Sequence, residues 1–315
     1  MTKIVSFPNQ EEQALRLAKK ALAEKNYLKA RTILATLYQT APSFEINRIY
    51  VEVLVLSGDE ELAMLTADEM EMEYLSSAEG VRQYFQLLVL NHRFIQAHIL
   101  LKSGREHPYF IEEQKMLELF EQVYAQSHAY VFETKSQQFA TFKENPATPY
   151  AKQWESWLLG LTKAQLMTLV IPELATQQRG LLHPRCCELL VKLGEKQTHQ
   201  VCHPLTNKLE NVSFSTLQLL EKSVAYEELE RLLTEQYSDQ PVIYEWLFAE
   251  ITGHWAMLFP FLPEKEEISS WVTAYAIDYS ESVKSVADTQ QTQFQIIIQQ
   301  KNQLRKNYME IYQDF

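Results

Sequence analysis

The fold is decided by a five-residue stretch that occurs three times, as Asn26-Tyr27-Leu28-Lys29-Ala30, Asp59-Glu60-Glu61-Leu62-Ala63 and Arg93-Phe94-Ile95-Gln96-Ala97. The alanines that close the three copies lie 33 and 34 residues apart. A fixed period of this length indicates stacked helix–turn–helix units, each of which buries its apolar side only against its neighbours. Small alanines let paired helices approach closely. The first third of the chain is therefore expected to be an array of helical hairpins.

Outside this stretch, the same period places Tyr50 and Tyr84 on first helices and Leu34, Ala67 and Leu101 on second helices. The pattern resembles the tetratricopeptide (TPR) repeat. It departs from that repeat where Ala14, Asn47 and Val81 replace the tryptophan of the first helix. The resemblance implies an α–α superhelix whose concave face, lined by the first helix of each repeat, binds a peptide.

A second resemblance covers nearly the whole chain. It is to an uncharacterised family of cytosolic TPR-containing proteins from low-GC Gram-positive bacteria. It rests on the order of these features: His183-Pro184, an expected hairpin, a helix over 226–233, His254, Phe259-Pro260-Phe261 and Trp271. It implies a TPR-like superhelix and a cytoplasmic location, and no catalytic role follows from it.

Glycine is rare, with seven residues in 315, and no two lie closer than 14 positions. A phosphate-binding loop needs several glycines within about six residues, so nucleotide-binding loops of that kind are excluded. We expect an all-α fold. Residues 1–145 are assigned to a TPR-like repeat domain of about three repeats with long capping helices, and residues 146–315 to a mainly helical C-terminal domain.

Local signals divide the C-terminal domain. Thr162 with Gln165 forms a capping box that opens a helix, Pro172 predicts the start of a further short helix, and Gly194 ends another. Alternating residues between 197 and 213 predict a short β-hairpin, with strands over 198–202 and 209–213.

Charge and cysteine content narrow the partners and the compartment. The formal net charge is −12, and residues 1–145 and 146–315 are both acidic, so binding to nucleic acid or an anionic membrane is not expected. Three cysteines are an odd number, which does not suit a disulfide framework. The N-terminus lacks the apolar run of a signal peptide, and we expect a cytoplasmic protein.

The predicted peptide-binding groove has five residues on the first helices. Arg48 and Arg82 lie one repeat apart and suit a carboxylate or an acidic peptide, because guanidinium groups bind carboxylates with two hydrogen bonds. Lys19, Glu52 and Gln86 occupy equivalent positions, where known carboxylate clamps carry asparagine. The alternative interpretation is that the arginines pair with glutamates on neighbouring helices.

A second group of residues allows a metal site. His183, Cys186, His199 and Cys202 have the spacing of zinc ligands. Against this, Cys186 shares helical spacing with Leu189, Leu190 and Leu193, which predicts a core position. We therefore assign no metal and expect no cofactor.

The sequence favours a non-enzymatic scaffold or adaptor that binds a protein or peptide in a TPR-like groove. One alternative is a sensor of small regulatory peptides, and another is a metal-dependent enzyme at the His/Cys group. An apolar stripe predicts a long C-terminal helix that either associates with a second chain or docks on its own domain; its members are Phe294, Ile297, Lys301, Leu304, Tyr308, Ile311 and Phe315.

Overall fold

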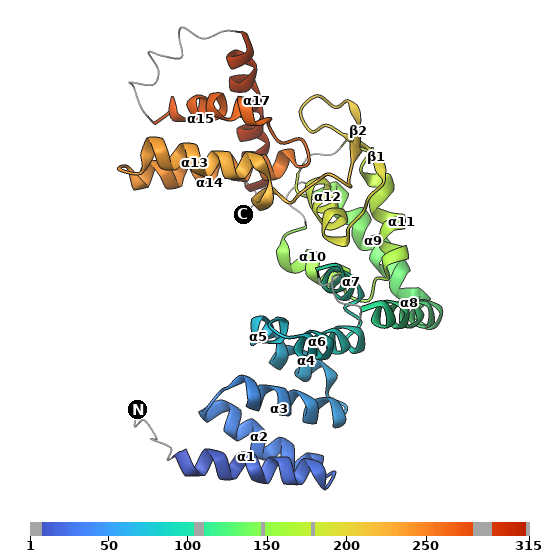
Figure 1. Cartoon of the computed structure of the whole chain (residues 1–315). Coiled ribbons are helices and arrows are strands. Elements are labelled where there is room, and N and C mark those ends of the chain that lie inside the picture. Colours follow the sequence, from blue (N-terminus) through green and yellow to red (C-terminus); the bar gives the residue numbers. More distant parts are fainter. Residues whose placement is uncertain (1–7, 104–109, 146–148, 178–179, 280–291, 313–315) are drawn as a thin grey trace. The chain divides into compact units, whose positions relative to one another are not determined.

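The computed structural model describes residues 8–103, 110–145, 149–177, 180–279 and 292–312 (Figure 1). Within these ranges all regular secondary structure is helical except for one two-stranded hairpin, which confirms the all-α expectation. It divides into two compact units, each described by itself. The N-terminal unit is Met1–Leu100 with Pro108–Glu121, and the C-terminal unit is Leu101–His107 with Gln122–Phe315.

The N-terminal unit is built from consecutive helices that pack in chain order (Figure 1). Helix α2 packs against both α1 and α3, α3 against α4, and α6 against α4 and α5. The bounds are α1 Pro8–Ala23, α2 Tyr27–Thr40, α3 Phe44–Leu56, α4 Glu60–Asp68, α5 Glu71–Leu75, α6 Ala78–Leu90 and α7 Phe94–Ser103.

The turn inside each helical hairpin repeats in its backbone geometry. Lys25, Gly58 and His92 follow the first helices and have positive φ angles of 57°, 76° and 55°. The next residue in each turn donates its N–H to the carbonyl five residues earlier, at 2.8, 3.0 and 2.8 Å. This left-handed C-cap satisfies carbonyls at the helix end. The period seen in the sequence is therefore also a period of backbone conformation.

Small residues lie where the paired helices meet. Ala30, Ala63 and Ala97 are all fully buried, as their spacing predicts. Asn47, at one of the positions where the TPR pattern has tryptophan, is buried too. Its Nδ2 donates to the Thr66 carbonyl at 2.7 Å, and its Oδ1 accepts from the Tyr74 hydroxyl at 2.9 Å. The buried amide of Asn47 is thus hydrogen-bonded through both its donor and its acceptor.

Helix α8, Phe110–Ser127, begins in the N-terminal unit and ends in the C-terminal unit. The sequence places the domain boundary later, at residues 145 and 146, where residues 146–148 lie outside the described residues. Helix α9, Ala129–Glu144, follows α8 after a break at His128.

The middle of the C-terminal unit contains α10 Ala151–Leu158, α11 Lys163–Glu173 and α12 Leu182–Leu193. Thr162 and Gln165 form the expected capping box, and Gly194, with φ 74°, ends α12. Pro172 opens no helix: it lies in the last turn of α11, so that expectation was wrong.

The expected hairpin is present with the expected bounds. Strand β1, Thr198–Cys202, pairs antiparallel with β2, Leu209–Ser213, and Thr198 lies opposite Ser213. It is the only sheet in the described part of the chain. Val201 and Cys202 are buried, whereas β2 is largely exposed, so the hairpin contributes mainly one strand end to the core.

Four helices enclose the last core of the C-terminal unit: α13 Val224–Tyr237, α14 Pro241–Leu258, α15 Ile268–Ala276 and α17 Thr292–Tyr312. Short 3₁₀ turns at Leu220–Lys222 (η1) and Lys265–Glu267 (η2) precede α13 and α15. The stripe of α17 packs against α14 and α15, and its described members are buried except for Tyr308, which is 38% exposed. It is therefore occupied within its own unit, which is the second of the two interpretations; Phe315 lies outside the described residues.

No helix in the described ranges is both long enough and apolar enough to cross a membrane.

Candidate functional site

A groove of about 270 Å³ lies on the N-terminal unit between α3 and α6, the first helices of the second and third repeats. Three of the five residues that the sequence predicts for a peptide groove line it: Arg48, Glu52 and Gln86. The structure thus brings together residues 34 positions apart, because equivalent faces of consecutive repeats lie side by side. We call this space the α3–α6 groove.

The floor of the α3–α6 groove is apolar. Leu56 and Leu90, at equivalent positions on the two helices, are 46% and 41% exposed. Val51, Leu87 and Tyr74 are buried beneath them. The groove residues predicted from the sequence do not include this floor, although Leu56 and Leu90 follow the repeat period of 34 residues, which could have identified them.

The rim of the groove is polar and carries one carboxylate without a counter-ion. Gln83 and Gln86 stand on α6, and Glu52 stands on α3. In the described part of the chain, Glu52 makes no ion pair. Amide side chains can both donate to and accept from a peptide backbone. The groove thus combines an apolar floor with hydrogen-bonding groups at its edge.

The three cations predicted for the groove all pair with a glutamate on the next first helix. Lys19 Nζ lies 2.7 Å from Glu45, Arg48 Nη2 2.5 Å from Glu79, and Arg82 Nε 3.0 Å from Glu113. In addition, Arg48 Nε donates to Gln83 at 2.9 Å. These pairs form a ladder across α1, α3, α6 and α8 and match the alternative interpretation of the arginines. An anionic ligand would have to displace a carboxylate from each arginine.

The four residues of the alternative metal site lie on two elements of the C-terminal unit. His183 and Cys186 are on α12, and His199 and Cys202 are on β1. In the described part of the chain, no three His, Cys, Asp or Glu side chains are grouped closely enough to hold a metal ion. Cys186 is fully buried, as its apolar spacing predicts.

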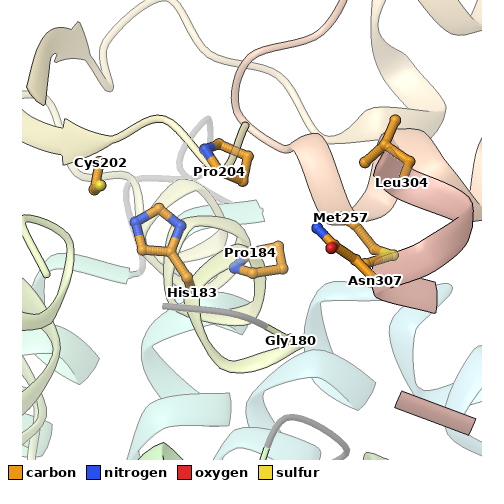
Figure 2. A pocket seen from close by; sticks show the side chains of 8 residues that line it. All are labelled: Gly180, His183, Pro184, Cys202, Pro204, Met257, Leu304 and Asn307. Atoms are coloured by element: carbon orange, nitrogen blue, oxygen red, sulfur yellow. The ribbon is translucent and has the colours of Figure 1, made fainter. Parts of the chain in front are cut away.

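Two of these four residues share a small pocket with Gly180, Pro184, Pro204, Met257, Leu304 and Asn307 (Figure 2). Figure 2 shows the His183 ring between Cys202 and Pro184, with Met257 and Asn307 on the other side of the pocket. The volume is about 20 Å³, which is enough for roughly one water molecule. A substrate does not fit in this space.

Burial also sets the chemistry of these side chains. It raises the pKa of all three thiols, so none of them is a ready nucleophile near neutral pH. Burial lowers the pKa of His183, whose Nε2 lies 3.0 Å from the Leu174 carbonyl. The neutral ring therefore donates Nε2–H to that carbonyl, and the histidine holds α12 against the end of α11.

No protein-family model, no curated protein and no solved structure matches this chain. The geometry of the described residues is therefore the basis for a functional proposal.

Proposed function

We propose that the N-terminal unit is a non-enzymatic binding module that takes an apolar side chain of a protein or peptide partner into the α3–α6 groove. The observation that carries the proposal is the pair of half-exposed leucines, Leu56 and Leu90, in the apolar floor of the groove. Fully burying a leucine is worth about 1.5–3 kcal/mol, so covering two half-exposed ones is a substantial driving force.

The rim supports a peptide as the occupant. Gln83 and Gln86 offer amide groups to the peptide backbone, while the floor takes the side chain. The carboxylate clamp predicted for Arg48 and Arg82 is the weaker form of the proposal. Both guanidinium groups already bind glutamates, and breaking those contacts would offset what an acidic ligand gains.

We also propose that the helical hairpins are TPR-like and that the protein is cytoplasmic. The recurrence of one turn geometry at Lys25, Gly58 and His92 supports the first proposal. The three buried, unpaired cysteines suit a reducing compartment, which supports the second.

The test is a selection of random displayed peptides on the intact protein, followed by measurement of their affinities for variants. Leu90→Asp places a charge in the groove floor and is expected to weaken the selected peptides at least tenfold. The matched control is Leu65→Asp, on the outer helix α4, where the leucine is 52% exposed and lines no part of the groove.

Peptides that bind Leu90→Asp as tightly as the unaltered protein, or a selection that enriches no peptide, would contradict the proposal. Circular dichroism of both variants checks that the helices are intact.

A further inference from the structure

The C-terminal unit contains a second, larger pocket that lies apart from the His/Cys group. It has a volume of about 420 Å³ and is bounded by α14, α17 and Tyr279. Its walls are Trp246, Ala249, Tyr279, Tyr308 and Met309, and its polar members are Glu250, His254 and Arg305. We call it the aromatic pocket.

The walls of the aromatic pocket are unusually exposed for side chains of this kind. Trp246 is 56% exposed and Met309 57%, while Tyr308 is 38% exposed. Trp246 lies 5.8 Å from Tyr279, measured between ring centroids, and Tyr308 lies 5.7 Å from the ring of His254. These rings already contact one another within each pair, and their remaining exposed faces can take another flat ring, which gains both apolar burial and ring contacts.

Beneath the walls lies a network of charged groups that balances itself. Arg305 binds both oxygens of Glu250, at 2.5 and 2.9 Å, and also pairs with Asp278. Lys301 Nζ donates to Asp278 at 2.9 Å and to the Ala274 carbonyl at 2.7 Å. The two carboxylates neutralise the two cations, so the network has no net charge that would attract a charged ligand.

Hydrogen-bond donors nevertheless remain at the base of the pocket. A guanidinium group has five N–H donors, and residues in the described part of the chain take three of those on Arg305. A phenylalanine or leucine side chain from a partner would cover the walls and leave these donors without an acceptor, which is costly.

His254 supplies a further donor. Its Nδ1 lies 2.6 Å from the Tyr275 hydroxyl. Burial lowers the pKa of His254 to about 4 and raises the pKa of Tyr275, so both groups are neutral near pH 7. The buried Tyr275 hydroxyl has a hydrogen-bond acceptor when it donates its proton to His254 Nδ1. The neutral imidazole of His254 then carries its own proton on Nε2. His254 lines the pocket and therefore presents an N–H group there.

We propose that the aromatic pocket binds a small planar aromatic molecule that carries a neutral hydrogen-bond acceptor. The ring lies against Trp246 and Tyr308, and the acceptor meets the donors of His254 and Arg305. The volume lies in the range of small-molecule sites, about 300–1,000 Å³, and has room for a ligand of one or two rings. This site is independent of the α3–α6 groove.

The experiment uses the full chain labelled with 5-fluorotryptophan and observed by fluorine NMR. The chain has five tryptophans, and Trp246 is the exposed one, since Trp154, Trp157, Trp255 and Trp271 are at most 9% exposed. Trp246→Phe assigns its signal by removing it. Three probes are titrated: benzamide has a ring and a neutral acceptor, toluene has only the ring, and cyclohexanecarboxamide has only the acceptor.

Benzamide is expected to shift the Trp246 signal saturably, with an affinity at least tenfold higher than either of the other probes. Tyr308→Ala is expected to weaken benzamide at least fivefold. Tyr130→Ala, which removes a 66% exposed tyrosine elsewhere in the same unit, is expected to leave its affinity unchanged. Equal responses to the three probes, no response to benzamide, or equal effects of the two tyrosine variants would overturn the proposal.

Discussion

At the scale of single residues, Asn47 shows how a position can depart from a repeat pattern without loss of packing. It stands where the pattern has tryptophan, and it is fully buried. Its amide donates to the Thr66 carbonyl and to the Tyr38 hydroxyl and accepts from the Tyr74 hydroxyl. Sequence comparison alone marks the position as a mismatch, because these partners come from α2, α4 and α5 and meet only in the folded unit.

Replacing Asn47 is therefore expected to destabilise the N-terminal unit. Asn47→Ala leaves the Thr66 carbonyl and the Tyr74 hydroxyl buried without their partner, at a cost of about 2–4 kcal/mol in the free energy of unfolding. Tyr74→Phe removes a single hydrogen bond and should cost less, about 1–2 kcal/mol. Urea unfolding followed by circular dichroism measures both. The reverse order of the two costs would show that the network is not what stabilises this position.

A second residue, His254, makes stability depend on pH. Its folded pKa is lowered to about 4 by burial, whereas the unfolded value is about 6.5. Between pH 6.5 and pH 4 the unfolded chain binds more protons at this residue than the folded chain does. The free energy of unfolding therefore falls as the pH falls through this range, and the contribution of the neutral His254 is fully present above pH 6.5. The contribution of His254 to the loss between pH 6.5 and 4.5 is expected to be about 2 kcal/mol.

The measurement compares urea unfolding, followed by tryptophan fluorescence, at several pH values. His254→Gln keeps an acceptor for Tyr275 but does not titrate, so its stability should change less over this range. Two charged neighbours of His254, Glu250 and Arg305, stay ionised in this window, because Arg305 lowers the pKa of Glu250 against its desolvation and the pairing raises the pKa of Arg305. His92→Asn, in the other unit, should retain the full pH dependence; an unchanged slope in His254→Gln would reject this assignment.

At the scale of helices and strands, turn and capping residues correctly predicted the features that depend on neighbouring residues alone. The hairpin has its expected strands, and the Thr162 capping box and the Gly194 helix end are present. The prediction that Pro172 opens a helix was wrong, because a proline can also lie inside a helix, where it removes one hydrogen bond. The surrounding residues decide whether a proline begins a helix or lies within one. The sequence of α17 likewise does not specify whether its stripe packs against its own unit or against another chain, because both partners would bury the same side chains.

The turns of the helical hairpins provide an element-scale prediction. Lys25 has a positive φ of 57°, a conformation that costs a residue with a Cβ about 1 kcal/mol, so Lys25→Gly is expected to stabilise the protein by about 0.5–1 kcal/mol. Gly58→Ala should destabilise by a similar amount through backbone strain alone, because a Cβ there would meet no atom within 4 Å.

Lys29→Gly, at an exposed position inside α2, is the control, and it should destabilise by about 1 kcal/mol. Urea midpoints measure all three variants. If Lys25→Gly destabilised as Lys29→Gly does, the turn would not have the left-handed conformation in solution.

At the scale of the whole molecule, the chain forms two compact units, and all five tryptophans belong to the C-terminal one. Tryptophan fluorescence therefore reports the unfolding of that unit, while circular dichroism reports the helices of both. Asn47→Ala is expected to shift the dichroism transition and leave the fluorescence midpoint where it is. Equal shifts in the two signals would show that the units unfold as one.

The helical class, the period of the N-terminal array, the position of the hairpin and three of the residues that line the α3–α6 groove could all be predicted from the amino-acid sequence. These follow from periodicity, capping and turn chemistry, which act over a few residues or recur at a fixed spacing. Two features depend on how the chain packs: Arg48 and Arg82 bind glutamates of the next first helix, and Trp246, Tyr279 and Arg305 meet in one pocket. Such contacts join segments separated by about 25 residues or more, and no local rule specifies which side chains packing will place together.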